Sequence, residues 1–366
     1  MHVARLILRD FRNYERAEVA LGAGLNVVVG ANGAGKTNML EALYFGLTAQ
    51  SCRTSNAREI VRVGASVARV EVHVQAEDGL HALEVGVEPG VEKVIRVDGT
   101  RLVAGVDAPR PLVSVFLPDR LGLVKGAPAG RRAHIDRVVV ALWPARAGTR
   151  SAYARALAQR NALIGRVRAG AARADLLDTW DRELAAHGAA LMADRAAAVE
   201  LVANAFATRA SELGLPEPAE LRYAPRCAAA EVEAIERELR EHRESDLDRG
   251  FTTHGPHRDD VALVHGGRLL RTLGSQGQQR IALLALLFAE RDALAARGAA
   301  PLMLLDDVMS ELDLTRRERL SELVAADGQT VITATEPEHV PGAEHGATVI
   351  AVTAGTVTES SARAAA

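Results

Sequence analysis

The sequence has few of the residues that mark secreted or membrane proteins. Its 366 residues include only two cysteines, Cys52 and Cys227, too few for a disulfide framework or for paired metal-binding motifs. No apolar run reaches the roughly 18 residues that a membrane-spanning helix needs. The stretch MHVARLILRDFRNY at the N-terminus alternates apolar and charged residues and lacks a signal-peptide core. We therefore expect a cytoplasmic protein.

Lysine and aromatic residues are also scarce. Only Lys36, Lys93 and Lys125 occur among 44 basic residues, and aromatic residues make up 3% of the chain, too few for a base-stacking platform. The formal net charge is −3, so any contact with nucleic acid must come from local groups of arginines. Apolar residues, in contrast, make up 48% of the sequence, and the length suits about two domains with their own cores.

The segment GANGAGKT (30–37) matches the phosphate-binding pattern G-x-x-x-x-G-K-[ST]. The β-branched run LNVVV before it is typical of a buried strand, and NMLEALYFGL after it has the apolar spacing of a helix. In such a loop the backbone N–H groups surround the β-phosphate, Lys36 neutralises phosphate oxygens and Thr37 gives its hydroxyl to Mg²⁺. The alternative is a glycine-rich turn ahead of a helix. The predicted nucleotide-binding residues are Gly30, Ala31, Asn32, Gly33, Ala34, Gly35, Lys36, Thr37 and Asn38.

A second motif, PLMLLDDVMSELD (301–313), places two aspartates directly after four apolar residues. This is the pattern of a strand that ends where a carboxylate can reach the metal ion of a nucleotide. We predict that Asp306 and Thr37 hold Mg²⁺ and that Asp307 polarises the attacking water. Lys36, Asp306 and Asp307 are therefore the predicted catalytic residues. The alternative is that the two aspartates only cap a helix.

The segment LGSQGQQR (273–280) begins a helix with a hydroxyl, a glycine and two amides, and the apolar run IALLALLFA follows. Backbone N–H groups at a helix start bind anions. The segment resembles the signature sequence of ABC-type ATPases. In that resemblance Ser275, Gly277 and Gln278 contact the γ-phosphate of ATP held by another copy of the chain, so that ATP joins two copies into a dimer. The alternative is an ordinary amphipathic helix with a polar N-cap.

Helical patterns occupy the middle of the chain, at 151–168, 173–213 and 231–248, with Gly170, Gly214 and Pro216 between them. At 1.5 Å per residue the longest spans roughly 60 Å, which suits a short lobe and excludes the very long coiled coils of SMC proteins. Alternating strands between 60 and 117, with a turn at VDGT, complete the first half of the remaining fold.

These patterns predict an α/β fold, namely an ABC-type P-loop ATPase head whose mixed sheet and flanking helices are split in sequence, with an inserted all-helical domain. We expect the first half of the head at 1–145, the helical domain at 146–249 and the second half of the head at 250–366.

Six blocks together resemble the RecF family of bacterial DNA replication and repair proteins. Two of them, KGAPAGRR and GPHRDD, distinguish this family from other ABC-type ATPases. The blocks are LRDFRNY (8–14), GANGAGKTNMLEALY (30–44), FLPDRLGLVKGAPAGRRAHID (116–136), THGPHRDD (253–260), SQGQQR (275–280) and LMLLDDVMSELD (302–313).

The resemblance implies a weak, DNA-stimulated ATPase that dimerises on ATP and binds single-strand gaps and junctions between single-stranded and duplex DNA. It also implies action with RecR and RecO in placing RecA on DNA, in support of replication forks and the SOS response. Alternatives are the ATPase subunit of a transporter, another short SMC-like DNA ATPase, or a monomeric P-loop kinase or GTPase.

The residues themselves leave DNA binding and the rate of hydrolysis open. The stretch 137–174 has eight arginines and no acidic residue, which suits phosphate contacts, but on an ideal helix Arg155 and Arg166 share a face that Arg160 does not. A solvated helix is the alternative. Asp307 stands where fast ABC ATPases have glutamate, and the strand TVITA lacks the usual γ-phosphate-sensing histidine after it, with only the hydroxyls of Thr333 and Thr335 nearby. We therefore expect slow turnover.

Overall fold

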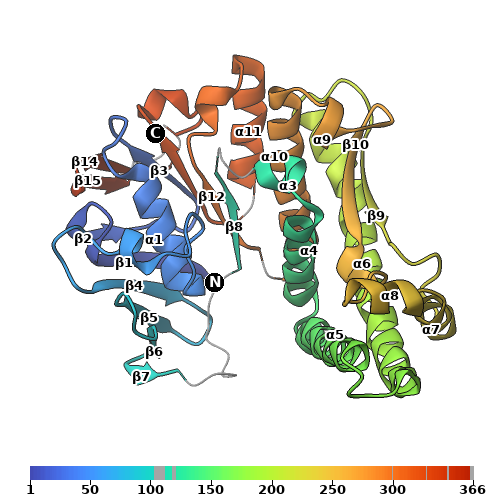
Figure 1. Ribbon diagram of the computed structural model, residues 1–366. Helices are drawn as coiled ribbons and strands as arrows, with labels where there is room; N and C mark the ends of the chain where they lie inside the picture. The colour runs from blue at the N-terminus through green and yellow to red at the C-terminus, as the bar shows by residue number, and fades with distance from the viewer. Residues whose placement is uncertain (103–111, 118–120, 299, 327, 344–345, 363–366) are drawn as a thin grey trace. The chain divides into compact units, whose positions relative to one another are not determined.

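The computed structural model describes residues 1–102, 112–117, 121–298, 300–326, 328–343 and 346–362. The chain divides into two compact units, Met1–Arg120 with Leu294–Ala366, and Leu121–Ala293. Figure 1 shows the elements of both. Among the helices of the described ranges, none combines the length and the apolar character that crossing a bilayer requires.

The first unit is built around a six-stranded, mostly parallel sheet. Its order is β15-β14-β3-β13-β12-β8, with only β15 antiparallel to its neighbour. The apolar runs that were predicted as strands form β3 and β12, which are buried in the core as parallel strands usually are. The strands are β3 (Leu25–Val29), β8 (Val113–Phe116), β12 (Leu302–Leu305), β13 (Thr330–Ala334), β14 (Thr348–Thr353) and β15 (Thr356–Ala362).

A second, antiparallel sheet in this unit has the order β2-β1-β4-β5-β6-β7. The predicted turn at VDGT joins β6 to β7, with positive φ angles of 49° at Asp98 and 78° at Gly99, as a two-residue hairpin loop requires. The strands are β1 (His2–Phe11), β2 (Tyr14–Ala20), β4 (Ala68–Gln75), β5 (Leu80–Val87), β6 (Val94–Val97) and β7 (Thr100–Arg101).

Helix α1 (Lys36–Thr48) contacts strands of both sheets and is buried on nearly all sides. A helix that is buried on nearly all sides belongs inside a core. Gly46 allows its close approach to β4, because a Cβ at this position would lie 2.4 Å from Cγ2 of Val72. The four-residue helix α2 (Ala57–Ile60) and the helix α11 (Leu314–Ala326) belong to the same unit.

The second unit is mainly helical. The predicted helical segment 151–168 lies in α5. Helix α6 covers most of the predicted segment 173–213 and, at 36 residues or about 54 Å, is the longest helix of the described ranges (Figure 1). Segment 231–248 forms two helices, α7 and α8, instead of one. The helices are α3 (Gly122–Lys125), α4 (Pro128–Leu142), α5 (Ala147–Arg168), α6 (Leu177–Glu212), α7 (Val232–Glu241), α8 (Arg243–Arg249), α9 (Leu270–Leu273) and α10 (Gln276–Ala295), which ends just past the unit boundary.

This unit also has a small antiparallel sheet, β11-β10-β9. Strand β9 (Ala219–Ala224) was not predicted, and it lies inside the segment expected to be all-helical. Pro216 and Pro218 prevent helix there, and the chain then pairs with β10 (Asp260–His265), which β11 (Arg268–Leu269) follows. The compact units therefore group 121–145 and 250–293 with the helices, and the division at 145/146 and 249/250 stays a prediction.

Candidate nucleotide site

The loop between β3 and α1 depends on glycines with positive φ. The φ angles are 154° at Gly30, 81° at Gly33 and 122° at Gly35, a region that other residues rarely adopt. A Cβ at Gly30 would also lie 2.2 Å from the carbonyl oxygen of Val352. Gly35 is the N-cap of α1 and has no side chain to occupy the first-turn N–H groups, which suits a phosphate-binding loop.

Two residues of the LRDFRNY block hold this loop from the side. The Asn13 Nδ2 donates a hydrogen bond to the Ala34 carbonyl at 3.0 Å, and the Tyr14 hydroxyl donates one to the Gly35 carbonyl at 3.0 Å. The backbone N–H of Gly355 also donates to Ala34, at 2.8 Å. The sequence alone did not reveal these supporting roles, although the LRDFRNY block was among the blocks that carried the resemblance.

Lys36 is buried, with 7% of its surface exposed. Its Nζ donates to the carbonyl oxygens of Gly30 at 2.7 Å and Ala31 at 3.1 Å. The ammonium group is therefore bound to the backbone of the loop that is predicted to hold the phosphates.

The predicted metal ligands Thr37 and Asp306 meet directly. The Thr37 hydroxyl lies 2.9 and 3.0 Å from the two carboxylate oxygens of Asp306, and the hydroxyl of Thr333 donates to Asp306 Oδ1 at 2.8 Å. Burial raises the pKa of Asp306, as does the charge of Asp307, while the hydrogen bonds from Thr333 and Thr37 and the charge of Arg53 lower it. A buried carboxylate beside a hydroxyl is an oxygen donor set that fits Mg²⁺.

The sheet order explains why Thr333 lies here. Strand β13 runs between β3 and β12, so the carboxyl ends of all three parallel strands meet at one edge. Thr333 also accepts a hydrogen bond from the backbone N–H of Asp307 at 2.8 Å. Asp307 has a φ of 44°, a conformation that costs energy in residues other than glycine and is often found at functional sites.

A histidine that the sequence analysis did not consider follows this strand. His339 Nδ1 lies 2.8 Å from the hydroxyl of Thr335, just beyond the end of β13. His339 therefore contacts one of the two hydroxyls that the sequence offered after this strand.

Arg12, from the LRDFRNY block, forms an ion pair with a residue of α1. Its guanidinium donates to both carboxylate oxygens of Glu41, at 2.6 and 2.9 Å, and Glu41 is fully buried in α1. Arg53 donates to Glu41 and to Asn38, and Asn38 also donates to Asn13 at 2.8 Å. Asn38 is thus bound into a polar network at the start of α1, and its predicted contact with nucleotide stays a prediction.

The predicted signature residues lie in the second unit, at the start of α10. Ser275 and Gln278 form a reciprocal capping box: the Ser275 N–H donates to Gln278 Oε1 at 2.9 Å, and the Gln278 N–H donates to Ser275 Oγ at 3.2 Å. Helix α10 therefore has the polar N-cap that the alternative interpretation predicts. It does not conflict with anion binding, because Ser275 Oγ accepts this bond and keeps its own proton.

Gly277 has open space around it. A Cβ there would meet no atom of this chain within 4 Å. Glycine lowers helix stability by roughly 1 kcal/mol relative to alanine, and nothing in the surrounding described residues requires it. The room at Gly277 is consistent with a ligand that approaches from outside the chain.

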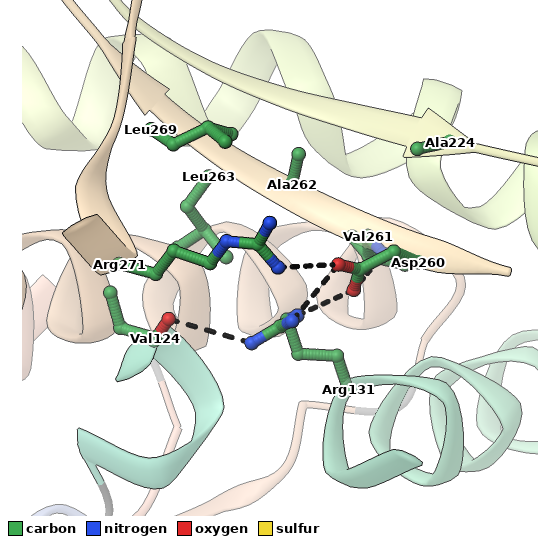
Figure 2. Close-up of a pocket in the computed structure, with 9 residues that line it drawn as sticks. All are labelled: Val124, Arg131, Ala224, Asp260, Val261, Ala262, Leu263, Leu269 and Arg271. Atoms are coloured by element: carbon green, nitrogen blue, oxygen red, sulfur yellow. Dashed lines mark hydrogen bonds and ion pairs between the residues drawn. The ribbon is translucent and has the colours of Figure 1, made fainter. Parts of the chain in front are cut away.

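The two family-specific blocks meet in this unit, as Figure 2 shows. Arg131 makes a two-pronged ion pair with Asp260, at 2.7 and 3.0 Å, and Arg271 contacts the same carboxylate at 3.3 Å. Arg132 donates to the carbonyl oxygen of Asp259 at 2.7 Å. These contacts join α4 to β10 beside a small, mostly apolar cavity of about 160 Å³. The charged residues of the two blocks therefore have a structural role within this unit.

The arginine-rich stretch 137–174 does not form one DNA-facing stripe. Arg160 is fully buried and pairs with Asp181 and Asp246, each at 2.6 Å. Three other arginines of the stretch also have acidic partners. These pairs are Arg146 with Asp194, Arg150 with Asp136 and Arg173 with Asp175.

Comparison with known proteins shows the family of this chain. The family model for the RecF/RecN/SMC N terminal domain matches residues 2–358. A DNA replication and repair protein RecF from Streptomyces avermitilis is 38% identical, over 98% of this chain and 99% of the relative. The chain belongs to the RecF family. The predicted resemblance to the RecF family is confirmed.

The solved structures agree with this assignment. The structure of the recombination mediator protein RecF-ATP in the RecFOR pathway matches with a TM-score of 0.85 and 27% identity, over 99% of this chain and 98% of that one. An Smc head bound to the C-winged helix domain of ScpA shares the fold, with a TM-score of 0.61 at 16% identity. The predicted fold class, an ABC-type ATPase head with an inserted helical part, is confirmed for this RecF family member.

Proposed function

We propose that this RecF family member is an ATP-dependent DNA-binding protein of recombinational repair. An ATP-driven dimer binds single-strand gaps and junctions of single-stranded and duplex DNA in the cytoplasm. With RecR and RecO it assists the loading of RecA, and so supports replication forks and the SOS response. The observation that carries the proposal is the meeting of Thr37, Asp306 and Thr333 beside the phosphate-type loop.

ATP is the substrate of the proposed site. The backbone of 30–38 surrounds the phosphates, and Lys36 neutralises their charge. Thr37 and Asp306 would hold Mg²⁺, which would supply positive charge beside the phosphates. Burial raises the pKa of Asp306, and a bound divalent cation would favour the ionised form of this carboxylate.

Hydrolysis in this site is slow and DNA-stimulated. Asp307 is the proposed group that orients the attacking water, and its side chain is one methylene shorter than the glutamate of fast ABC ATPases. A residue with a shorter reach positions water less well. Slow hydrolysis lets bound ATP act as a timer for the dimer.

The dimer completes the site from two copies. Ser275, Gly277 and Gln278 of one copy approach the γ-phosphate held by the loop of the other. The capping box presents the helix start as a fixed anion-binding surface, and Gly277 leaves space for the phosphate. ATP then links the copies and its hydrolysis releases them.

The test is binding of the purified chain to gapped and blunt duplex DNA, with and without Mg-ATP, across a salt series. We expect binding that requires ATP, is tighter on gapped DNA and weakens steeply with salt. The Lys36→Met variant should lose the ATP dependence. Equal affinity for gapped and blunt DNA, or binding that ignores ATP, would contradict the proposal.

A further inference from the structure

Three arginines lie side by side on the antiparallel sheet of the first unit. Arg9 of β1 is directly opposite Arg16 of β2 on one side and directly opposite Arg69 of β4 on the other. All three side chains are exposed, on the face of the sheet away from α1. We call Arg9, Arg16 and Arg69 the arginine row.

Like charges directly opposite each other weaken a sheet unless something neutralises them. Within the described residues, no carboxylate or other side chain forms an ion pair or hydrogen bond with any arginine of the row. Most of the surrounding acidic residues have arginine partners, and Glu71 contacts His73. The pairs are Glu18 with Arg5, Glu71 with His73, Glu84 with Arg96, and Asp10 and Glu15 with Arg62.

The row lines two shallow hollows in the surface. One, of about 260 Å³, is formed by all three arginines with Ile7, Leu8, Glu71 and Glu84. The other, of about 420 Å³, shares Arg9 and Arg69 and continues toward Gly64 and Ser66. The positive charge is therefore concentrated in an accessible depression of a chain whose net charge is −3.

We propose that the arginine row binds the phosphate backbone of the duplex arm of DNA. Strands lie about 4.8 Å apart, so the row spans about 10 Å, and phosphates along one strand of a duplex rise about 3.4 Å each. Guanidinium groups are well suited to phosphate oxygens. No aromatic residue lines either hollow, so the face offers no stacking platform for unpaired bases and reads no sequence.

This inference rests on the proposed function, and deepens it by naming the surface that holds duplex DNA. The test variant replaces Arg9, Arg16 and Arg69 with glutamine, and a second variant replaces the three with lysine. The control is Arg5→Gln with Glu18→Gln, which alters the same face but removes an ion pair and leaves the net charge unchanged.

Binding to blunt duplex DNA is measured by fluorescence anisotropy across a salt series with Mg-ATP. Each lost phosphate contact flattens the slope of log affinity against log salt by about 0.9, so the glutamine variant should be flatter by about 2 to 3. Its affinity at low salt should fall about 10-fold or more. The lysine variant and the control should stay near the parent in DNA binding. The glutamine variant should unfold at the parent's temperature or above it, because it loses the repulsion between the arginines.

A glutamine variant with the parent's affinity and salt slope would overturn the inference while leaving the proposed function intact. If that variant kept DNA binding but lost a protein partner, the row would belong to an acidic protein surface and the inference would also fall. A parent chain that binds no DNA under any condition would overturn both.

Discussion

At the scale of single residues, Thr333 links the two aspartates of the candidate site. Its hydroxyl donates to Asp306 and accepts from the backbone N–H of Asp307. The sequence showed only a hydroxyl near the end of a strand. Its role depends on β13 lying between β3 and β12, which spacing along the chain does not reveal.

Replacing Thr333 with valine should therefore destabilise the protein and slow ATP hydrolysis. Two hydrogen bonds are lost, and Asp306 and the Asp307 N–H each lose a buried partner, at a cost of about 1–3 kcal/mol. Thr330 provides the control: it lies on the same strand, is equally buried, and its hydroxyl has no hydrogen-bond partner among the described residues. Urea unfolding should show little or no loss for Thr330→Val, and equal midpoints for the two variants would contradict this account.

His257 makes the stability of the second unit depend on pH. Burial lowers the pKa of His257 to about 4. The charges of Arg258 and Arg132 also lower this pKa, and the hydrogen bond with Thr252 raises it. Its Nδ1 lies 2.7 Å from the hydroxyl of Tyr153 and its Nε2 lies 3.0 Å from the Thr252 carbonyl oxygen. The folded protein therefore holds a neutral imidazole.

Because the unfolded chain takes up this proton near pH 6.5 and the folded chain only near pH 4, stability should decline as pH falls between these values. The His257→Gln variant should lose some stability at neutral pH but show a shallower decline across this window. Thermal unfolding of both proteins at several pH values measures the difference. Parallel declines would show that His257 contributes nothing to the pH dependence.

At the scale of elements, helix α5 combines a buried ion-pair network with an exposed face. Arg160 lies at the centre of the network, bonded to Asp181, Asp246 and Thr252. Arg155 and Arg166 lie on the exposed side of the same helix. The eight arginines of 137–174, without an acidic residue among them, suggested DNA contacts. The structure shows that Arg160 instead holds helices together.

Arg160→Met should destabilise the protein by about 3–5 kcal/mol, because the buried carboxylate of Asp246 loses its counter-charge and that of Asp181 keeps only Arg243. Arg155→Met should change stability by less than about 0.5 kcal/mol, since its side chain is exposed. Chemical unfolding of the two variants provides the comparison. Similar losses for both would contradict the structural assignment of Arg160.

Elements with strong local signals were predictable, and those set by distant pairing were not. The strand LNVVV, the helix after the loop and the hairpin at VDGT carry their own apolar periodicity or turn residues, and the structure has them where expected. Strand β9 exists because β10, about 40 residues later, pairs with it, so no local pattern marked it. The predicted loop, Thr37 and Asp306 come together, whereas the supporting contacts of Asn13, Tyr14 and Gly355 come from the two ends of the chain.

At the scale of the whole molecule, the proposed dimer requires two copies to share each ATP. The loop and the two aspartates belong to one compact unit, and the signature residues belong to the other. Gly277 and Gly148 offer a matched pair for testing this: each is the second residue of its helix, and a Cβ at either would meet nothing in the chain within 4 Å. Alanine at either position should therefore leave the monomer intact, with a small gain in helix stability.

The most direct test is sedimentation of the Asp307→Asn variant with Mg-ATP, in which hydrolysis is blocked. We predict a dimer that persists when Gly148→Ala is added and is lost when Gly277→Ala is added. A variant that stays monomeric with Mg-ATP, or a dimer indifferent to Gly277→Ala, would contradict the claim that each copy completes the nucleotide site of the other.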